Sequence, residues 1–271
     1  MTERTRTALT IAGSDSGGGA GIQADLKTFE AHGLFGMSVI TSITAQNTRG
    51  VTGVWDLPPE AVRAQLEALF DDLPVDVIKI GMLSNNDITE VVADVLEGYS
   101  QDIPIILDPV MVATSGDRLL SEDTYNSMTS RLFPLATLVT PNIREAEVLW
   151  GHEIRGEEEM AEGGKAMCRF GSKGVLITGG DGDDEEEVID LFFNGEEIFS
   201  FKGERIKSRD THGTGCTLSS AIAANLALGA GIVEAIERAR EYVRQGIIAA
   251  PGLGNGHGPL RHRIPVPGHG A

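Results

Sequence analysis

A short glycine-rich segment near the C-terminal end, THGTGCT (residues 211–217), has the residue types of an anion-binding site. Its two glycines let the backbone approach a ligand closely. The helix expected to begin near Gly215 points unpaired N–H groups and the positive end of its dipole into the same space, which suits a phosphate. Cys216 falls in the first turn, where the dipole is expected to lower the pKa of the thiol and favour the thiolate. A glycine-rich helix start with a small buried cysteine is the alternative, and this segment alone does not decide between them.

A second glycine cluster, GSDSGGGAG (residues 13–21), follows an apolar run and precedes a helical pattern. This arrangement predicts a strand–loop–helix unit whose loop lies at the carboxyl edge of an open α/β sheet, where ligands bind. The cluster is neither a P-loop, because no Gly-Lys-Ser/Thr follows, nor the Gly-x-Gly-x-x-Gly pattern. Its glycines exceed what one tight turn needs, which favours close approach of a flat ligand.

Polar residues follow several of the predicted strands. Asp108 comes where a buried strand opens into a loop, and Gln46 closes another strand. Gln46 can donate and accept, which suits the edge of an aminopyrimidine or a similar heterocycle, although it could also simply close a loop. Asn142 and Glu145 have the spacing of a helix capping box. A hydrated Mg²⁺ site is the functional alternative, and from the residues alone the cap is favoured.

The elements that must position these residues alternate between strand and helix. Such alternation predicts an α/β fold, a parallel sheet covered by helices on both faces. Expected strands are 8–12, 37–45, 51–57, 75–80, 103–107, 138–140, 175–178 and 188–193, and expected helices are 20–32, 60–71, 87–99, 122–132, 143–150, 157–170, 215–229 and 232–249. No linker or repeat divides the chain, so we expect one domain over residues 1–271, with a partly irregular tail at 251–271.

Composition excludes several classes of protein. The formal charge is −18 from 40 acidic and 22 basic residues, with no basic stripe, so nucleic acid is not an expected partner. The longest apolar stretch, 218–236, contains Ser, Asn, Gly and Glu and fits two helices of a water-soluble protein better than a membrane span. Two cysteines form no disulfide framework, and the first residues lack a signal-peptide core, so we expect a cytoplasmic location. The lysine-poor, acidic composition suggests adaptation to high salt.

Six segments together resemble the hydroxymethylpyrimidine/phosphomethylpyrimidine kinase family of thiamine biosynthesis, a branch of the ribokinase-like superfamily. They are AGSDSGGGAGIQADLKTF (12–29), TAQNTRGV (44–51), KIGML (79–83), LDPVMVATSG (107–116), TPNIREAE (140–147) and THGTGCTLSSAIAA (211–224). They span most of the chain in the order of the family. The resemblance implies a ribokinase-like fold, with a central, mainly parallel sheet flanked by helices and a small flap over the substrate site.

The resemblance also implies an activity and its residues. The enzyme would use ATP and Mg²⁺ to phosphorylate 4-amino-5-hydroxymethyl-2-methylpyrimidine and then the monophosphate. An anion hole around the transferred phosphoryl group would be formed by Gly213, Thr214, Gly215 and Cys216, with Cys216 either accepting the hydroxymethyl proton or only completing the hole. The pyrimidine pocket would be lined by Gly13, Asp25, Gln46, Met82 and Val110, although Asp25 could instead brace the glycine loop. ATP would contact Asn142, Thr178 and Thr211, and the metal would be held by Glu145 and Asp108. We expect a homo-oligomer, a dimer.

One departure from the family stands out. Members often carry Lys-Gly-Gly-His after the late strand, with the lysine reaching the ATP phosphates, whereas this chain has Thr178-Gly179-Gly180-Asp181. Mg²⁺ or an arginine would then neutralise more of the charge of the ATP phosphates. Arg209 is a candidate because it is near Thr211 in the sequence. Two other functions remain open: a pyridoxal/pyridoxine kinase, and a non-catalytic pyrimidine-binding regulator.

Overall fold

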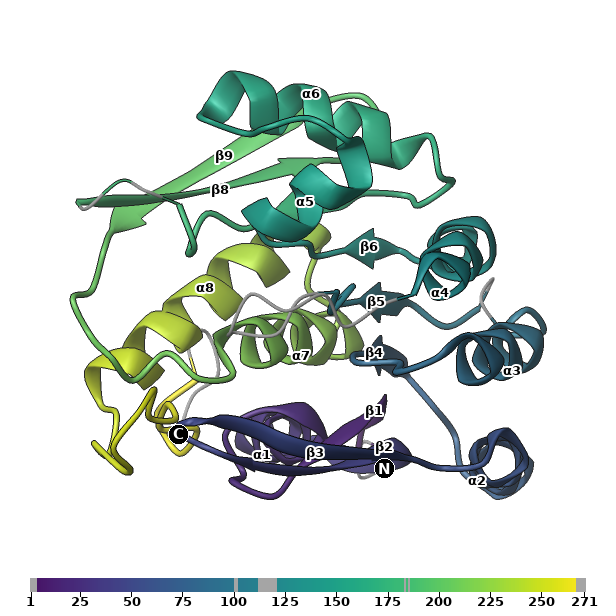
Figure 1. Ribbon diagram of the computed structural model, residues 1–271. Helices are drawn as coiled ribbons and strands as arrows, with labels where there is room; N and C mark the ends of the chain where they lie inside the picture. The colour runs from purple at the N-terminus through teal and green to yellow at the C-terminus, as the bar shows by residue number, and fades with distance from the viewer. Residues whose placement is uncertain (1–3, 100–101, 112–120, 183, 185, 267–271) are drawn as a thin grey trace.

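The computed structural model describes residues 4–99, 102–111, 121–182, 184 and 186–266 (Figure 1). Within these residues one sheet has nine strands in the order β3-β2-β1-β4-β5-β6-β7-β8-β9. The pairs from β2 through β1 to β7 are parallel, and the β2–β3, β7–β8 and β8–β9 pairs are antiparallel. The strands are β1 (Thr7–Asp15), β2 (Phe35–Asn47), β3 (Gly50–Asp56), β4 (Val77–Ile80), β5 (Ile105–Leu107), β6 (Leu138–Val139), β7 (Val175–Ile177), β8 (Glu187–Phe193) and β9 (Ile198–Glu204).

Helices cover both faces of this sheet. They are α1 (Gly21–Ala31), α2 (Pro59–Asp72), α3 (Asn86–Leu96), α4 (Glu122–Ser127), α5 (Ile143–Trp150), α6 (Glu157–Cys168), α7 (Thr214–Ala227) and α8 (Ile232–Ile248). Figure 1 shows α2, α3 and α4 on one side of the central strands and α1, α7 and α8 on the other. The expected fold class, a mainly parallel sheet flanked by helices, is confirmed.

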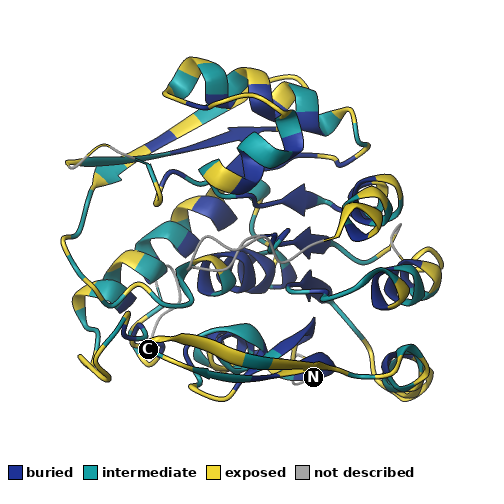
Figure 2. Ribbon diagram, viewed as in Figure 1, coloured by how far each residue is buried: buried dark blue, intermediate teal, exposed yellow. Residues whose placement is uncertain are grey.

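Alternation along the central strands fixes which side chains meet which helices. In β5, Ile105 and Leu107 pack with α2, α3 and α5, while Ile106 packs with α1, α7 and α8. The strands are buried on both faces, as Figure 2 shows in dark blue for the centre of the sheet. Two polar residues, Thr10 of β1 and Lys79 of β4, lie on the α1–α7 side of the core and are fully buried.

Most expected elements are present, and the differences have local causes. Strand β9 was not expected; Phe199 and Phe201 alternate there with polar residues, which is the pattern of a half-exposed strand. The helix expected over 122–132 is α4 continued by a π-helical turn, Met128–Leu132, and a 3₁₀ turn, Phe133–Leu135, in which Pro134 cannot continue α-helical hydrogen bonding.

The chain order of the strands locates the site. From β1 the chain passes to β2 on one side, whereas β4 lies on the other side of β1. In open α/β sheets ligands bind outside the carboxyl ends of the strands where the order reverses in this way. That position lies between Gly13, at the bulge of β1, and Met82, which follows β4.

Candidate active site

The two glycine-rich segments lie against each other. Gly213 has a φ of +83°, and a Cβ built on it would overlap the carbonyl oxygen of Gly19. Gly213 is also the N-cap of α7, which the structure describes in full and which has no side-chain cap. The first turn of α7 therefore opens toward the loop that follows β1. The N–H of Thr214 donates to the Thr211 carbonyl at 3.3 Å, and those of Gly215 and Cys216 are the ones offered to an anion.

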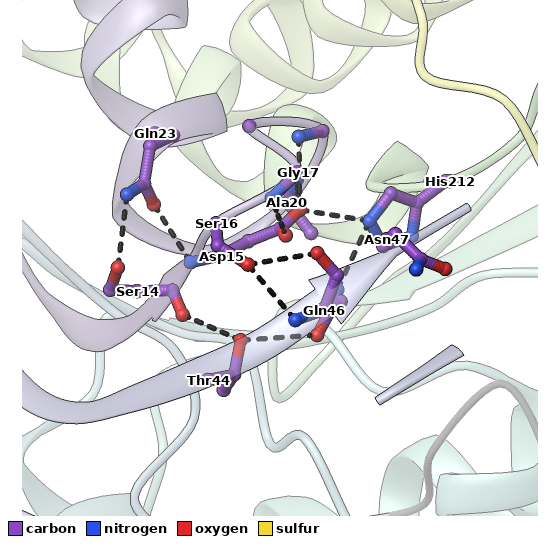
Figure 3. Close-up of polar contacts among 12 residues, drawn as sticks. Ser14, Asp15, Ser16, Gly17, Ala20, Gln23, Thr44, Gln46, Asn47 and His212 are labelled. Atoms are coloured by element: carbon purple, nitrogen blue, oxygen red, sulfur yellow. Dashed lines mark hydrogen bonds and ion pairs between the residues drawn. The ribbon is translucent and has the colours of Figure 1, made fainter. Parts of the chain in front are cut away.

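A polar network joins the first loop to the segment before α7 (Figure 3). Oδ1 of Asp15 accepts the N–H of Gly17 at 2.7 Å, and Oδ2 accepts those of Gly19 and Ala20 at 2.9 and 2.8 Å. Nε2 of His212 lies 2.9 Å from the same Oδ2. Burial raises the pKa of Asp15, but these hydrogen bonds outweigh it and hold the pKa below its ordinary value. The sequence analysis assigned neither Asp15 nor His212 to the site.

Gln46 ends β2 beside this network. Its side-chain amide lies 3.1 Å from Nε2 of His212 and 3.5 Å from the Thr44 hydroxyl. The N–H of Gln46 donates to the Ser16 hydroxyl at 2.9 Å, and that hydroxyl donates to the Gln46 carbonyl at 2.8 Å. The loop after β1 and the end of β2 thus hold each other in place, and Gln46 stays half-buried at the edge of the site.

Gly13 and Met82 meet at the position where the strand order reverses. A Cβ on Gly13 would lie 2.6 Å from Cε of Met82 and 2.7 Å from Oγ of Ser42, so a larger residue there would require these side chains to move. The carbonyl of Met82 accepts the Thr41 hydroxyl at 2.9 Å, which ties the segment after β4 to β2. Val110 is half-buried two residues after Asp108. Within the resemblance motif 107–116, residues 112–116 lie outside the described residues.

Asp25 is placed differently from the other expected lining residues. It has no exposed surface and lies between α1, α7 and the sheet. Its carboxylate accepts the hydroxyls of Thr10 and Ser220, both at 2.7 Å, and lies 3.1 Å from Nζ of Lys79. Because these contacts enclose it completely, Asp25 lies beneath the site and does not line its surface.

Lys79 is a site residue that the sequence analysis did not assign. It is fully buried, and its Nζ also lies 3.9 Å from Asp108. Burial lowers the pKa of Lys79, but the charges of Asp25, Cys216 and Asp108 raise it above its ordinary value. Lys79 therefore stays protonated and places a positive charge beneath the first turn of α7.

The expectation of a low pKa for Cys216 is wrong. Burial raises the pKa of the thiol to about 12, and the carboxylates of Asp108 and Asp25 add to this, while the charge of Lys79 opposes it. Desolvation and two neighbouring negative charges raise the pKa of this thiol by more than the helix dipole lowers it. Cys216 is a thiol at neutral pH in this structure.

Asp108 lies under the start of α7. Its Oδ2 accepts the Ser219 hydroxyl at 3.3 Å, and a Cβ on Gly215 would lie 3.9 Å from the same oxygen. Burial raises the pKa of Asp108, Lys79 lowers it, Asp25 raises it further, and the net shift is upward. This carboxylate therefore lies between the anion-binding turn and the strand ends.

Asn142 and Glu145 form the capping box of α5. The Asn142 side chain accepts the N–H of Glu145, and the Glu145 carboxylate accepts that of Asn142, both at 3.0 Å. Glu145 also accepts the N–H of Met111 at 3.2 Å. Burial and then the charge of Asp108 raise the pKa of Glu145 to about 8, and Asp181 contributes as well.

The carboxylates around Glu145 fit a bound divalent cation in part. No cluster of three or more metal-ligating side chains occurs among the described residues. However, burial raises the pKa of Glu145, and repulsion by the nearby carboxylates of Asp108 and Asp181 raises it further. A divalent cation relieves such repulsion, and Mg²⁺ needs only one or two protein carboxylates because it keeps its waters.

The loop after β7 is held by an arginine that the sequence analysis did not single out. Arg205 donates to the carbonyl oxygens of Asp184 (2.5 Å), Gly180 (2.6 Å), Gly182 (3.1 Å) and Gly179 (3.3 Å). The N–H of Gly179 donates to Asp190 at 2.7 Å. Thr178 donates its N–H to Pro141 at 2.9 Å, which places it beside Asn142. By contrast, Arg209 is exposed and lies 3.9 Å from Asp210, and Thr211 is exposed as well.

Within the part of the chain that the structure describes, no helix combines the length and the apolar character needed to cross a bilayer.

Comparisons with known proteins match one kinase family in sequence and structure, and a pyridoxal kinase in structure as well. A sequence model of the family described as phosphomethylpyrimidine kinase matches residues 15–261. A hydroxymethylpyrimidine/phosphomethylpyrimidine kinase from Rhizobium meliloti (strain 1021) is 51% identical over 261 residues, which make up 95% of this chain and 97% of that protein. The crystal structure of a phosphomethylpyrimidine kinase from Clostridium difficile 630 superposes with a TM-score of 0.80 at 42% identity, over 90% of this chain and 100% of the other. An ADP complex of Bacillus subtilis pyridoxal kinase gives a TM-score of 0.88 at 38% identity, over 96% and 98% of the two chains.

Proposed function

The chain belongs to the phosphomethylpyrimidine kinase family and is a phosphotransferase of thiamine biosynthesis that acts on hydroxymethylpyrimidine and its monophosphate, and we propose which of its residues bind the phosphoryl group, the pyrimidine and ATP. The observation that carries the proposal is the contact between Gly213 and Gly19. It brings the anion-binding turn of α7 next to the loop that follows β1, so a phosphoryl group and a heterocycle fit side by side.

The transferred phosphoryl group is bound by the backbone at the start of α7. Gly213, Thr214, Gly215 and Cys216 supply this anion hole, because the uncapped first turn offers N–H groups and the positive end of the helix dipole. Lys79 adds a buried positive charge beneath it. Preorganised donors of this kind stabilise charge in the transition state at no reorganisation cost.

The pyrimidine lies between the first loop and the segments after β4 and β5. Gly13, Gln46, Met82 and Val110 line this pocket, and Gln46 hydrogen-bonds the polar edge of the ring. Asp25 supports the pocket indirectly through its ion pair with Lys79.

ATP lies along the ends of β6 and β7. Asn142 and Thr178 are adjacent there, and Thr211 stands before the anion-binding turn. Glu145 and Asp108 would hold Mg²⁺, because the charge of Asp108 raises the pKa of buried Glu145 and a bound cation would favour the ionised form of both carboxyl groups. When bound, Mg²⁺ supplies positive charge to the phosphate oxygens. Arg205 shapes the loop after Thr178 through its carbonyls, so it orders this loop and does not take the place of the family lysine at the phosphates.

In the reaction, the hydroxymethyl oxygen forms a bond to the γ-phosphorus while the bond from that phosphorus to the bridging oxygen breaks, leaving ADP. Phosphoryl transfer passes through a loose transition state, so the alcohol proton leaves late and a strong base is unnecessary. The backbone amide of Cys216 stays in the anion hole, and its side chain accepts the alcohol proton only in the thiolate form; where Cys216 is a thiol, the proton leaves on an oxygen of the transferred phosphoryl group. The second reaction repeats the transfer onto a phosphate oxygen of the monophosphate.

A kinetic assay with both pyrimidines tests this function. The enzyme is incubated with ATP, Mg²⁺ and either the hydroxymethylpyrimidine or its monophosphate, and products are read by mass spectrometry. Formation of both the monophosphate and the pyrophosphate is expected. Binding of the pyrimidine without any phosphorylated product would instead support the non-catalytic regulator.

Pyridoxal is a second candidate substrate. The observation that favours it is the structural similarity to the Bacillus subtilis pyridoxal kinase. Pyridoxal offers a hydroxymethyl group on a nitrogen heteroaromatic ring, as the pyrimidine does. ADP release with each substrate decides, and a higher kcat/KM for pyridoxal would reverse the assignment.

A homodimer is supported by the free edge of the sheet. β3 is an edge strand, and Val51, Val54 and Trp55 on it are exposed together with Ile43 of β2. Such an apolar edge is a surface that proteins usually cover. Analytical ultracentrifugation of the wild type and of Trp55→Lys tests this, with a monomeric wild type as the contrary result.

We also propose that residues 1–271 form one domain in the cytoplasm and that its acidic surface is adapted to high salt. The continuous sheet from β3 to β9 supports one cooperative unit, and two free cysteines suit a reducing compartment. Calorimetry should give one unfolding transition, and stability should rise from dilute buffer to molar KCl because salt screens the net charge of −18. Maximal stability in dilute buffer would contradict the salt adaptation.

A further inference from the structure

We infer that His212 is a positioning residue: held by Asp15, it fixes the Gln46 amide in one of its two orientations, and so lets the site distinguish a 4-aminopyrimidine from its 4-oxo counterpart. This inference rests on the proposed function, because it takes the pyrimidine as the ligand of Gln46. The three residues come from the loop after β1, the end of β2 and the segment before α7 (Figure 3).

The contact with Asp15 fixes the proton on His212. The carboxylate of Asp15 accepts three backbone N–H groups, which favours its ionised form, and an ionised carboxylate can only accept. Nε2 of His212 lies 2.9 Å from Oδ2 of this carboxylate, and the two side chains are only 14% and 3% exposed. Nε2 must therefore carry a hydrogen, whether the ring is neutral or protonated.

That hydrogen sets the orientation of Gln46. The position 3.1 Å from Nε2 of His212 is occupied by Nε2 of the Gln46 amide, and two N–H groups cannot satisfy each other. A half-turn about the Cγ–Cδ bond exchanges the amide oxygen and nitrogen. The oxygen then shares the single Nε2 hydrogen of His212 with Asp15 in a three-centre hydrogen bond, and the nitrogen takes the position 3.5 Å from the Thr44 hydroxyl. That hydroxyl donates to the Ser14 carbonyl at 2.8 Å, so its lone pairs are free to accept from the amide.

The fixed amide presents one pattern to a ligand. One N–H and one oxygen lone pair of Gln46 stay free after the contacts with Thr44 and His212. A 4-aminopyrimidine offers the complement, a ring nitrogen that accepts and an amino group that donates. A 4-oxo pyrimidine offers the reverse, a ring N–H and a carbonyl, and it would require the reversed amide. An untethered glutamine can turn to fit either ring, whereas reversal here would set N–H against N–H at His212.

The discriminating experiment measures kcat/KM for 4-amino-5-hydroxymethyl-2-methylpyrimidine and for its 4-oxo counterpart. Wild type, His212→Leu and a control, His152→Leu, are compared; His152 is an exposed histidine that contacts the Trp150 ring. We expect the wild type and the control to prefer the amino compound at least a hundredfold. In His212→Leu the preference should shrink at least tenfold, with KM for the amino compound changing more than kcat.

Each contrary result has a separate meaning. A wild type that phosphorylates neither pyrimidine contradicts the proposed function itself. A wild type that phosphorylates the amino compound but discriminates weakly, or a folded His212→Leu with undiminished preference, overturns the inference alone.

A second measurement avoids any loss of folding in the variant, since His212 packs tightly against Gly19. Nitrogen-15 NMR of the wild-type histidines reports which ring nitrogen of His212 carries the hydrogen. A proton on Nε2 is expected. A neutral ring with its proton on Nδ1 only would overturn the inference.

Discussion

The ammonium group of Lys79 lies 3.1 Å from the carboxylate of Asp25, and both side chains are fully buried. One comes from β4 and the other from α1, so the pair ties the helix that follows the glycine loop to the centre of the sheet. Asp108 lies 3.9 Å from the same ammonium group. A single buried positive charge thus balances the carboxylates beneath the anion-binding turn.

Lys79→Met should destabilise the protein strongly, because it leaves Asp25 buried without its counter-charge. Removing one partner of a buried pair costs about 3–5 kcal/mol. Lys79→Met/Asp25→Asn should recover part of that loss, while the exposed control Lys173→Met should change the free energy of unfolding by less than about 0.5 kcal/mol. Denaturant unfolding measures all three. A single Lys79→Met variant as stable as the wild type would refute this account of the pair.

Gly213→Ala should lower both stability and activity, and Gly33→Ala is its matched control. Both glycines have positive φ, +83° and +78°, but only at Gly213 would a Cβ overlap another backbone atom, while Gly33 has nothing within 4 Å. Gly33→Ala should therefore cost only the backbone strain, roughly 1–2 kcal/mol. Gly213→Ala should cost more and also lower kcat/KM at least tenfold, because it separates the two glycine-rich segments. Equal losses in thermal unfolding and kinetics for the two variants would contradict the close contact.

Cys216 should react slowly with iodoacetamide at neutral pH. The pKa of about 12 exceeds the ordinary value of 9.0 by about three units, so the thiolate fraction at pH 7 is about a thousandfold lower than for an unperturbed thiol. The labelling rate is measured by mass spectrometry in a Cys168→Ala background, which removes the other cysteine. Rapid labelling of Cys216 at pH 7 would show that its thiolate is stabilised after all.

If the Cys216 thiolate takes the substrate proton, kcat should rise with pH in the wild type, and replacing Cys216 should abolish this pH dependence. Well below its pKa the thiolate fraction grows tenfold for each pH unit, so wild-type kcat should rise between pH 7 and pH 9. Cys216→Ala should have a lower kcat with little pH dependence, and its KM for the pyrimidine should stay close to that of the wild type. Undiminished turnover in Cys216→Ala would leave only the backbone amide of this residue in the mechanism.

His262 should make the protein less stable below about pH 6.5. Burial and then the charge of Lys27 lower the pKa of His262 to about 4, and the ring contacts the Thr217 hydroxyl at 3.0 Å. Between pH 6.5 and 4 the unfolded chain binds a proton at this residue and the folded chain does not, so stability falls as pH falls, by up to about 3 kcal/mol.

His262→Gln cannot titrate, so its unfolding free energy should decline less over this range than that of the wild type. Chemical unfolding at several pH values gives the difference in unfolding free energy between the two proteins. The contributions of titrating groups that both proteins share cancel in this difference. A constant difference from pH 7 to pH 4 would contradict the lowered pKa.

Local patterns in the sequence predicted most of the fold. The apolar run of β1 and the amphipathic pattern of α3 can be recognised in the sequence, because residues close in sequence determine a strand or a helix of this kind. β9 was missed although Phe199 and Phe201 alternate with polar neighbours there. The π-helical turn at Met128–Leu132 gave no signal in the sequence.

Contacts between distant residues limited prediction of the site. Asp15 and His212 are separated by 197 positions, and only the fold brings them within 2.9 Å. The pKa of Cys216 was mispredicted for the same reason: the helix dipole is a local property, whereas burial beside Asp108 depends on the assembled sheet. The resemblance to a family predicted relationships between distant residues that spacing alone could not. It placed Gly13 and Met82 in one pocket, and the structure has them in contact.

One wall of the site comes from a segment far along the sequence from the glycine loop that it covers. His212 donates its N–H to the carbonyl of Gly258 at 3.0 Å, and a Cβ on Gly19 would lie 3.1 Å from Pro259. The loop after β1 therefore depends on residues 258–259 for one wall of its pocket. Truncation before Gly258 should abolish ligand binding even where the sheet still assembles.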